Sequence, residues 1–162
     1  MKLQQLYLII GLSVILAGCE SSSKKQPSGI SLMKYGIPIS LNVPDDAVVS
    51  QGSSGRLSTD VNIKSGADFH LHVFMTSAIN SDLQAIKKRY KDDVVSNPYF
   101  IKMLEEFDDG FIFEINSVSG FEKKYDFRRI ILQGDKEILF QSGVTGEFDE
   151  KAVKKMYHSL IR

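Results

Sequence analysis

The sequence contains a single cysteine, Cys19, and this scarcity excludes a fold stabilised by internal disulfides. It also has no excess of charge, because 20 basic residues balance 20 acidic ones. That balance gives no indication of a nucleic-acid-binding surface or of a strongly charged partner. Without disulfides the domain must be stabilised by a hydrophobic core, and a chain of 162 residues is long enough to bury one.

Familiar catalytic motifs are also missing. The sequence has no G-x-S-x-G turn for a serine nucleophile, no phosphate-binding P-loop and no G-x-G-x-x-G run. The only thiol lies near the N-terminus, in a segment that reads as a targeting signal. We therefore expect this protein not to be an enzyme, and to need no cofactor.

The first nineteen residues have the three parts of a signal peptide, in the usual order. Lys2 supplies the positive charge, and an apolar run follows from Leu6 to Ala17 (LYLIIGLSVILA). A membrane-spanning helix needs about 20 apolar residues to cross the hydrocarbon core, so this run is too short for a comfortable permanent span. The small residues Ala17 and Gly18 then indicate a cleavage site.

Leu16–Cys19 (LAGC) resembles the lipobox of bacterial lipoproteins. The resemblance implies that Cys19 receives a diacylglycerol, that residues 1–18 are removed, and that a further acyl chain such as palmitate is added to the new amine. Two or three acyl chains anchor a protein stably where one would not. The alternative is an ordinary secretory signal that contains a cysteine by chance.

The mature chain would begin with a tether, residues 19–29, and continue as one globular domain, residues 30–162. Glu20–Gly29 (ESSSKKQPSG) has no apolar residue, which predicts disorder. Ten flexible residues span roughly 17 Å on average, so the domain would stay close to the bilayer. Glu20 follows the cysteine where a retention signal would have Asp. By resemblance to enterobacterial sorting, this favours the outer membrane of the cell envelope, with the domain facing periplasm or cell surface.

Apolar periodicity predicts the first half of the domain. Alternation with period two indicates strands, and spacing of three and four indicates a helix. Ser81 begins a capping box with Gln84, which predicts a helix start there. The expected elements are strands at Ile30–Tyr35, Ile37–Val43, Leu57–Ile63 and Phe69–Thr76, a loop at Gln51–Gly55, and a helix with a buried stripe of Leu83, Ile86, Tyr90 and Val94.

The second half is expected to be a four-stranded meander followed by a helix capped by Asp149. The predicted strands are Tyr99–Phe107, Phe111–Asn116, Lys124–Gln133 and Glu137–Thr145, with a tight turn at Asp108–Gly110 in which the glycine takes a positive φ. Three of these strands have consecutive apolar residues, so both of their faces need cover. We therefore predict an α+β fold in which two main helices cover an antiparallel sheet of about six to eight strands.

This arrangement resembles the PsbP-like superfamily over roughly residues 31–162. The resemblance lies in the start Tyr35–Pro44 (YGIPISLNVP), the capped middle helix, and the closing Gly146–Glu150 (GEFDE) followed by Met156–Leu160 (MYHSL). It implies an α/β/α sandwich and a non-enzymatic accessory or binding role. No binding motif of a characterised member matches, so the resemblance implies no site residues.

Asp68, His70 and His72 form the sharpest candidate site, for a metal ion. Residues two apart on a strand lie on one face at about 6.6 Å, so two imidazoles and a carboxylate can share a metal. The structural alternative is a polar strand face opposite Phe69 and Leu71. A metal-dependent, possibly hydrolytic protein is therefore the alternative function.

Two charged groups give further alternatives. Basic residues could bind an anion or could pair with acids across strands. Acidic residues at one hairpin end could bind calcium or act as catalytic carboxylates, or they could simply be solvated. The basic group is Lys123, Lys124, Arg128 and Arg129, and the acidic group is Glu105, Glu106, Asp108 and Asp109. The favoured function remains a membrane-anchored, non-catalytic binding or accessory domain for an envelope protein or small ligand.

Overall fold

The computed structural model describes residues 29–55, 58–117 and 123–160. In chain order the elements are β1 (Gly29–Ser31), the 3-10 helix η1 (Met33–Tyr35), β2 (Ser40–Asn42), β3 (Val48–Ser54), β4 (Ser58–Ser65), β5 (Phe69–Ser77), α1 (Leu83–Val95), β6 (Phe100–Phe107), β7 (Gly110–Asn116), β8 (Lys123–Gln133), β9 (Lys136–Ser142) and α2 (Glu150–Ser159).

The main feature is a seven-stranded antiparallel sheet with strand order β3-β4-β5-β9-β8-β7-β6, and β1 and β2 pair in a small sheet of their own. This confirms the predicted α+β class, the number of strands and the two main helices. None of the helices in the described ranges is long and apolar enough to cross a membrane.

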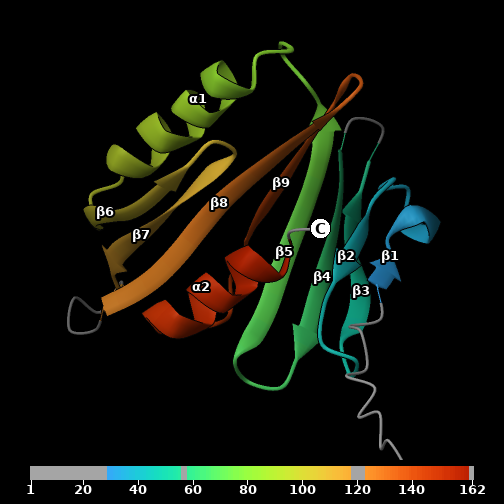
Figure 1. Ribbon diagram of the computed structural model, residues 1–162, viewed down its shortest axis with the longest axis horizontal. Helices are drawn as coiled ribbons and strands as arrows, with labels where there is room; N and C mark the ends of the chain where they lie inside the picture. The colour runs from blue at the N-terminus through green and yellow to red at the C-terminus, as the bar shows by residue number, and fades with distance from the viewer. Residues whose placement is uncertain (1–28, 56–57, 118–122, 161–162) are drawn as a thin grey trace, which may run out of the picture.

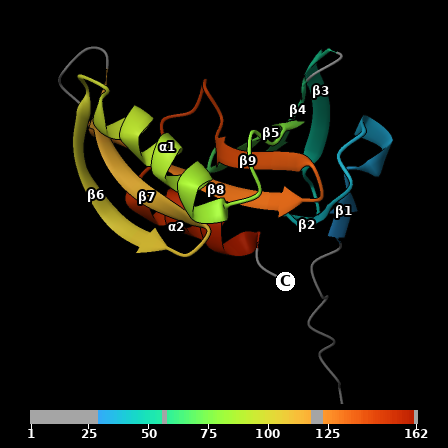
Figure 2. The same ribbon diagram turned by 90° about the horizontal axis from the view of Figure 1, so that it is seen from above.

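The two helices cover opposite faces of the main sheet (Figures 1 and 2). The sequence of the central strands requires this, because Ile138, Leu139 and Phe140 of β9 are consecutive and all three are buried. α1 covers Leu139 and Ile130, whereas α2 and the β1–β2 layer cover the face that contains Ile138 and Phe140. The central strands are therefore buried on both faces, as their apolar runs predict.

α1 begins at a different cap from the one predicted. Asp82, not Ser81, is the N-cap, and its carboxylate accepts hydrogen bonds from the backbone amides of Gln84 at 2.9 Å and Ala85 at 3.3 Å. A carboxylate at this position also interacts favourably with the helix dipole. The Gln84 side chain instead donates to the carbonyl of Asp108 at 3.0 Å, so it joins α1 to the β6–β7 turn.

A buried carboxylate attaches α1 to the sheet. Glu137 of β9 is 1% exposed, and its Oε1 accepts hydrogen bonds from Arg89 at 2.7 Å and from the hydroxyl of Tyr90. Burial, together with this hydrogen bond to Glu137, raises the pKa of Tyr90 well above its usual value. The predicted apolar stripe is confirmed beside these contacts, because Ile86 and Val94 are buried against the sheet.

α2 is attached to the opposite face through Tyr157. Its hydroxyl donates to Asp109 at 2.7 Å, and the same carboxylate accepts a hydrogen bond from Arg129 at 2.8 Å. The Tyr157 ring stacks on Phe107 with the ring centroids 4.5 Å apart. Asp149 caps this helix as predicted, accepting from the amide of Ala152 at 2.7 Å.

The N-terminal segment departs from the prediction in four places, one of which is that the strand expected at Ile37–Val43 is only β2, Ser40–Asn42. Of the strand expected at Ile30–Tyr35, only β1 forms, because the chain then turns into η1. Gly36, with a φ of 81°, ends this 3-10 helix. Gly29, expected in the tether, belongs to β1. The sequence also gave no prediction of β3 (Val48–Ser54), whose second half was expected to be a loop. Polar serines and a glycine conceal the second half of this edge strand, which pairs with β4. Its first half is also held by Val49, which packs against the core and accepts a hydrogen bond from the Tyr35 hydroxyl at 3.2 Å.

Gly110 lies in the predicted turn, but the predicted reason for a glycine there was wrong. Its φ is not positive, whereas those of Gly66 and Gly134 are. A side chain at residue 110 is instead excluded by close packing. A Cβ would lie 2.2 Å from the carbonyl oxygen of Arg128 and 2.9 Å from the hydroxyl of Tyr157. The glycine thus lets the β6–β7 hairpin approach both β8 and α2.

We expect Gly110→Ala to destabilise the protein by about 1–3 kcal/mol, because β8 backbone and the Tyr157 hydroxyl would both have to shift. Urea unfolding measures this. Gly55→Ala is the matched control, since a Cβ there would meet no heavy atom nearer than the Ser58 carbonyl oxygen at 3.9 Å. Equal stability of the two variants would contradict the close-packing explanation.

Candidate functional site

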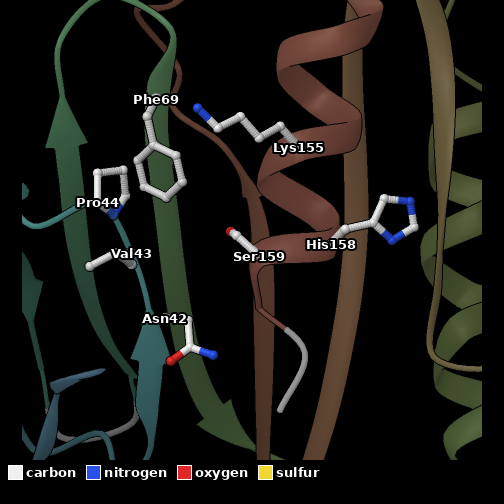
Figure 3. A pocket seen from close by; sticks show the side chains of 7 residues that line it. All are labelled: Asn42, Val43, Pro44, Phe69, Lys155, His158 and Ser159. Atoms are coloured by element: carbon white, nitrogen blue, oxygen red, sulfur yellow. The ribbon is translucent and has the colours of Figure 1, made fainter. Parts of the chain in front are cut away.

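A groove of about 440 Å³ lies between α2 and the segment that follows β2 (Figure 3). Its volume falls within the range of about 300–1,000 Å³ that is usual for small-molecule sites. The residues that line it are Asn42, Val43, Pro44, Phe69, Lys155, His158 and Ser159. These residues come from three separate elements, so the groove exists only in the folded chain.

The apolar part of the groove consists of Val43, Pro44 and Phe69. Phe69 is the first residue of β5 and belongs to the same face of the sheet as α2. In Figure 3 its ring lies between the segment containing Pro44 and the helix. The groove is therefore the seam between two covers of one sheet face, α2 on one side and the β1–β2 layer on the other.

Lys155 supplies a positive charge at this seam. It extends from α2 toward Phe69 (Figure 3), and no carboxylate of the described residues lies within ion-pairing distance of it. The preceding residue, Lys154, contrasts with it by binding both Glu105 at 2.6 Å and Glu150 at 2.7 Å. These two carboxylates raise the pKa of Lys154. Lys155 is thus the amine that remains available to a ligand.

Two other polar side chains of the groove, Ser159 and His158, are engaged or turned away. The Ser159 hydroxyl donates to the carbonyl of Met156 at 2.8 Å. The His158 ring points away from Phe69 in Figure 3 and makes edge contacts with Phe107 and Tyr157. The groove therefore combines an apolar wall with a lysine that has no carboxylate partner in the described part of the chain, and Ser159 and His158 do not form a nucleophile–base pair there.

The predicted metal ligands lie elsewhere, on or beside the opposite face of the sheet. His70 and His72 share the α1 face of β5, as their spacing predicts, whereas Asp68 is exposed in the turn before the strand. His70 Nε2 lies 3.1 Å from Asn62 Oδ1, and His72 Nε2 lies 2.9 Å from Asp60 Oδ2. The carboxylate near His72 is therefore Asp60 of β4, which faces it across the strands.

The hydrogen bonds of His72 occupy both of its ring nitrogens. If Nε2–H donates to Asp60, Nδ1 accepts from the Gln141 amide, which lies 3.1 Å away. This tautomer is assigned from the bonding pattern. In this tautomer the only ring lone pair, on Nδ1, is used by Gln141 and is not free for a metal. Among the residues that the structure describes, no group of three His, Cys, Asp or Glu side chains is placed to hold a metal ion.

The basic group proposed from the sequence is neutralised by carboxylates on the same strand, on a neighbouring strand and in loops. Lys123 pairs with Glu114 at 2.9 Å and Arg129 with Asp109 at 2.8 Å. Lys124 binds Glu147 and Arg128 binds Asp126, at 2.6 and 2.5 Å. A second hollow of about 320 Å³ is lined in part by Arg128 and Lys124, but both cations already have these partners. This arrangement favours the interpretation in which these charges pair with acids.

The acidic group is likewise dispersed rather than gathered. Glu105 binds Lys154 of α2, and Glu106 binds Lys91 of α1 at 2.7 Å. The two helices lie on opposite faces, so these neighbouring carboxylates point to opposite sides of β6. Asp109 is held by Arg129 and Tyr157. The calcium and paired-carboxylate interpretations thus gain no support from the geometry.

Sequence reasoning did not identify the groove. Lys155 and Ser159 lie beside the buried stripe of α2 and look like ordinary surface residues, and Val43 and Phe69 look like ordinary core residues. Only the crossing of α2 over β5 brings them together. The predicted lipidation residue, Cys19, lies outside the described residues.

His70 should make stability depend on pH. Burial, reinforced by the nearby charges of Lys64 and His72, lowers its pKa below the usual 6.5. As the pH falls below about 6.5, His70 takes up a proton in the unfolded chain before it does so in the folded protein. Protonation therefore favours the unfolded state, and the contribution of this residue to stability is lost. We expect the free energy of unfolding, measured in urea at about pH 7.5 and about pH 5.5, to fall less in His70→Gln than in the parent.

The exposed His158 provides the control for this measurement. His158→Gln should retain the pH dependence of the parent protein. An identical decrease in stability for His70→Gln and the parent would show that His70 is not the group responsible.

Comparisons with protein-family models, with curated proteins and with solved structures found no match. The function therefore has to be inferred from the geometry of the groove and from the N-terminal sequence.

Proposed function

We propose that this chain is a lipid-anchored lipoprotein of the cell envelope, and that its folded domain is a non-catalytic binding module. Leu16–Cys19 supports the anchor, since these four residues resemble a lipobox. The single observation that carries the binding role is the groove beside α2, which joins an apolar wall to a cation that has no carboxylate partner among the residues the structure describes. We place the ligand or partner site there.

The chemistry of the groove supports binding rather than catalysis. Nucleophilic catalysis needs a nucleophile and a base within hydrogen-bond reach of each other. Ser159 instead donates to the Met156 carbonyl, and His158 packs against Phe107. An apolar wall with few polar groups is the common composition of a ligand pocket.

We also propose that the domain is a variant of the PsbP-like sandwich. The order of elements and the presence of one helix on each face of the antiparallel sheet support this proposal. Because a fold does not determine a function, the resemblance adds only a general expectation of an accessory role. The outer membrane remains the predicted location, with periplasm and cell surface as alternative sides.

The metal-binding alternative, through Asp68, His70 and His72, stays a prediction. Its geometry is less favourable than that of the groove, because Asp68 is exposed in a turn and both histidines are hydrogen bonded to β4. A metal would have to displace Asn62 and Asp60 from the rings. We therefore rank this function second.

The lipid anchor can be tested with Cys19→Ser in cells fed labelled palmitate. The parent should lose residues 1–18, incorporate the label and sediment with membranes, because only the thiol of Cys19 can form the thioether. Cys19→Ser should carry no label, and Ser21→Ala, two residues later, should behave like the parent. Parent protein with an intact leader or a free thiol at residue 19 would refute the anchor.

The groove can be tested with the amphiphilic fluorophore 1-anilinonaphthalene-8-sulfonate. Ser159→Phe places a ring inside the groove and should weaken binding at least about fivefold, the equivalent of roughly 1 kcal/mol. Ser81→Phe adds the same ring to an exposed loop residue before α1 and should bind as the parent does. Equal affinities of Ser159→Phe and the parent would rule out the groove as the binding site of this probe.

A further inference from the structure

The chain enters the described fold next to the groove. Gly29, the first residue of β1, pairs with Asn42 of β2, and Asn42 is one of the residues that line the groove. Val43 and Pro44, which follow directly, form part of its apolar wall. Whatever holds the chain by its N-terminus therefore holds this side of the domain.

The length of the preceding segment limits how far the groove can be from the anchor. Ten residues, Cys19 to Ser28, separate the predicted lipid attachment from β1. Even when fully extended, ten residues reach at most about 36 Å. The groove is thus kept near the lipid headgroups, where bilayer amphiphiles have a far higher effective concentration than solutes from the bulk.

Each of the two parts of the groove, the apolar wall and the cation, matches one part of such an amphiphile. Val43, Pro44 and Phe69 provide an apolar wall for an acyl chain, and Lys155 provides a cation for an acidic head. An acyl chain that moves from the bilayer into an apolar groove exchanges one apolar surrounding for another. The polar contact therefore decides which amphiphile is bound, and the sign of Lys155 favours an anion.

We propose that the groove binds one acyl chain with an anionic head group, drawn from the bilayer to which the chain is tethered. This inference rests on the proposed lipid anchor and binding role, and it names their ligand class. Lys155 contacts the acidic group, while Phe69 and Val43 contact the chain.

The experiment uses the full mature lipoprotein in phosphatidylcholine nanodiscs that contain a trace of a diazirine-labelled palmitic acid. After illumination, mass spectrometry should locate the cross-link on peptides containing Val43 or Phe69. The uncharged methyl ester of the same probe should label these peptides at least about fivefold less, since it lacks the charge that Lys155 recognises.

Two substitutions in α2 provide a matched pair. Lys155→Glu should reduce labelling by the acid at least about fivefold and leave labelling by the ester unchanged, and Lys155→Arg should restore labelling by the acid. Lys151→Glu is the control, because Lys151 is exposed one turn earlier, does not line the groove and has no carboxylate partner among the described residues. Equal loss in Lys151→Glu would point to net charge and overturn the role of Lys155.

Cys19→Ser tests whether the bilayer is the source. Produced without residues 1–18 and added to the same nanodiscs, this variant should be labelled less than the tethered parent. Unchanged labelling would overturn the tethering argument, and increased labelling would mean that the acyl chains on Cys19 occupy the groove themselves.

The failures of the two proposals are distinguishable. Equal labelling by acid and ester, unaffected by Lys155→Glu, would overturn the anionic ligand while leaving a binding groove intact. No cross-link at the groove, combined with fluorophore binding that Ser159→Phe weakens, would overturn the membrane amphiphile alone. No cross-link and no groove-dependent fluorophore binding would overturn the binding function as well.

Discussion

The burial of the central strands on both faces is the constraint on which the rest of this structure depends. Ile138, Leu139 and Phe140 of β9 leave no polar face that could be exposed to water, and Phe111, Ile112 and Phe113 of β7 repeat the pattern. Each face therefore needs its own cover. α1 provides one, attached through the buried carboxylate of Glu137, and α2 contributes to the other through Tyr157 and Asp109.

The candidate site follows from how the second face is covered. α2 lies over one part of it, and the short β1–β2 layer lies over another. α2 and the β1–β2 layer leave a groove where they meet, and Phe69 lines it. The opposite face has α1 and, beside it, a polar network in which Asp60, Gln141 and Asn62 satisfy the two histidines of β5. In that network both histidines have hydrogen-bond partners, whereas at the seam Lys155 has no carboxylate partner among the described residues.

Local patterns predicted much of the fold and little of the site. The stripe of α1 and the meander were predictable because periodicity reports which side of an element is apolar. The cap of α1 and the reason for Gly110 were not, because Asp82 and Ser81 are both acceptable caps and because a close approach involves α2, which is distant in sequence. β3 escaped prediction since its polar side chains carry no burial signal. The spacing of His70 and His72 placed them correctly on one face, but it could not reveal Asp60 across the sheet.

The sequence by itself determined the predicted anchor at Cys19, the lack of disulfides, the α+β class and the two-sided burial of the central strands, because these depend on neighbouring residues or on composition. Tertiary structure alone decided which charges are already paired and which remain available. Lys154 and Lys155 are adjacent and chemically identical, yet only Lys154 reaches Glu105, since β6 lies beneath one side of α2 and the groove beneath the other. Ion pairing and cavities depend on distances between elements, and no local pattern encodes those distances.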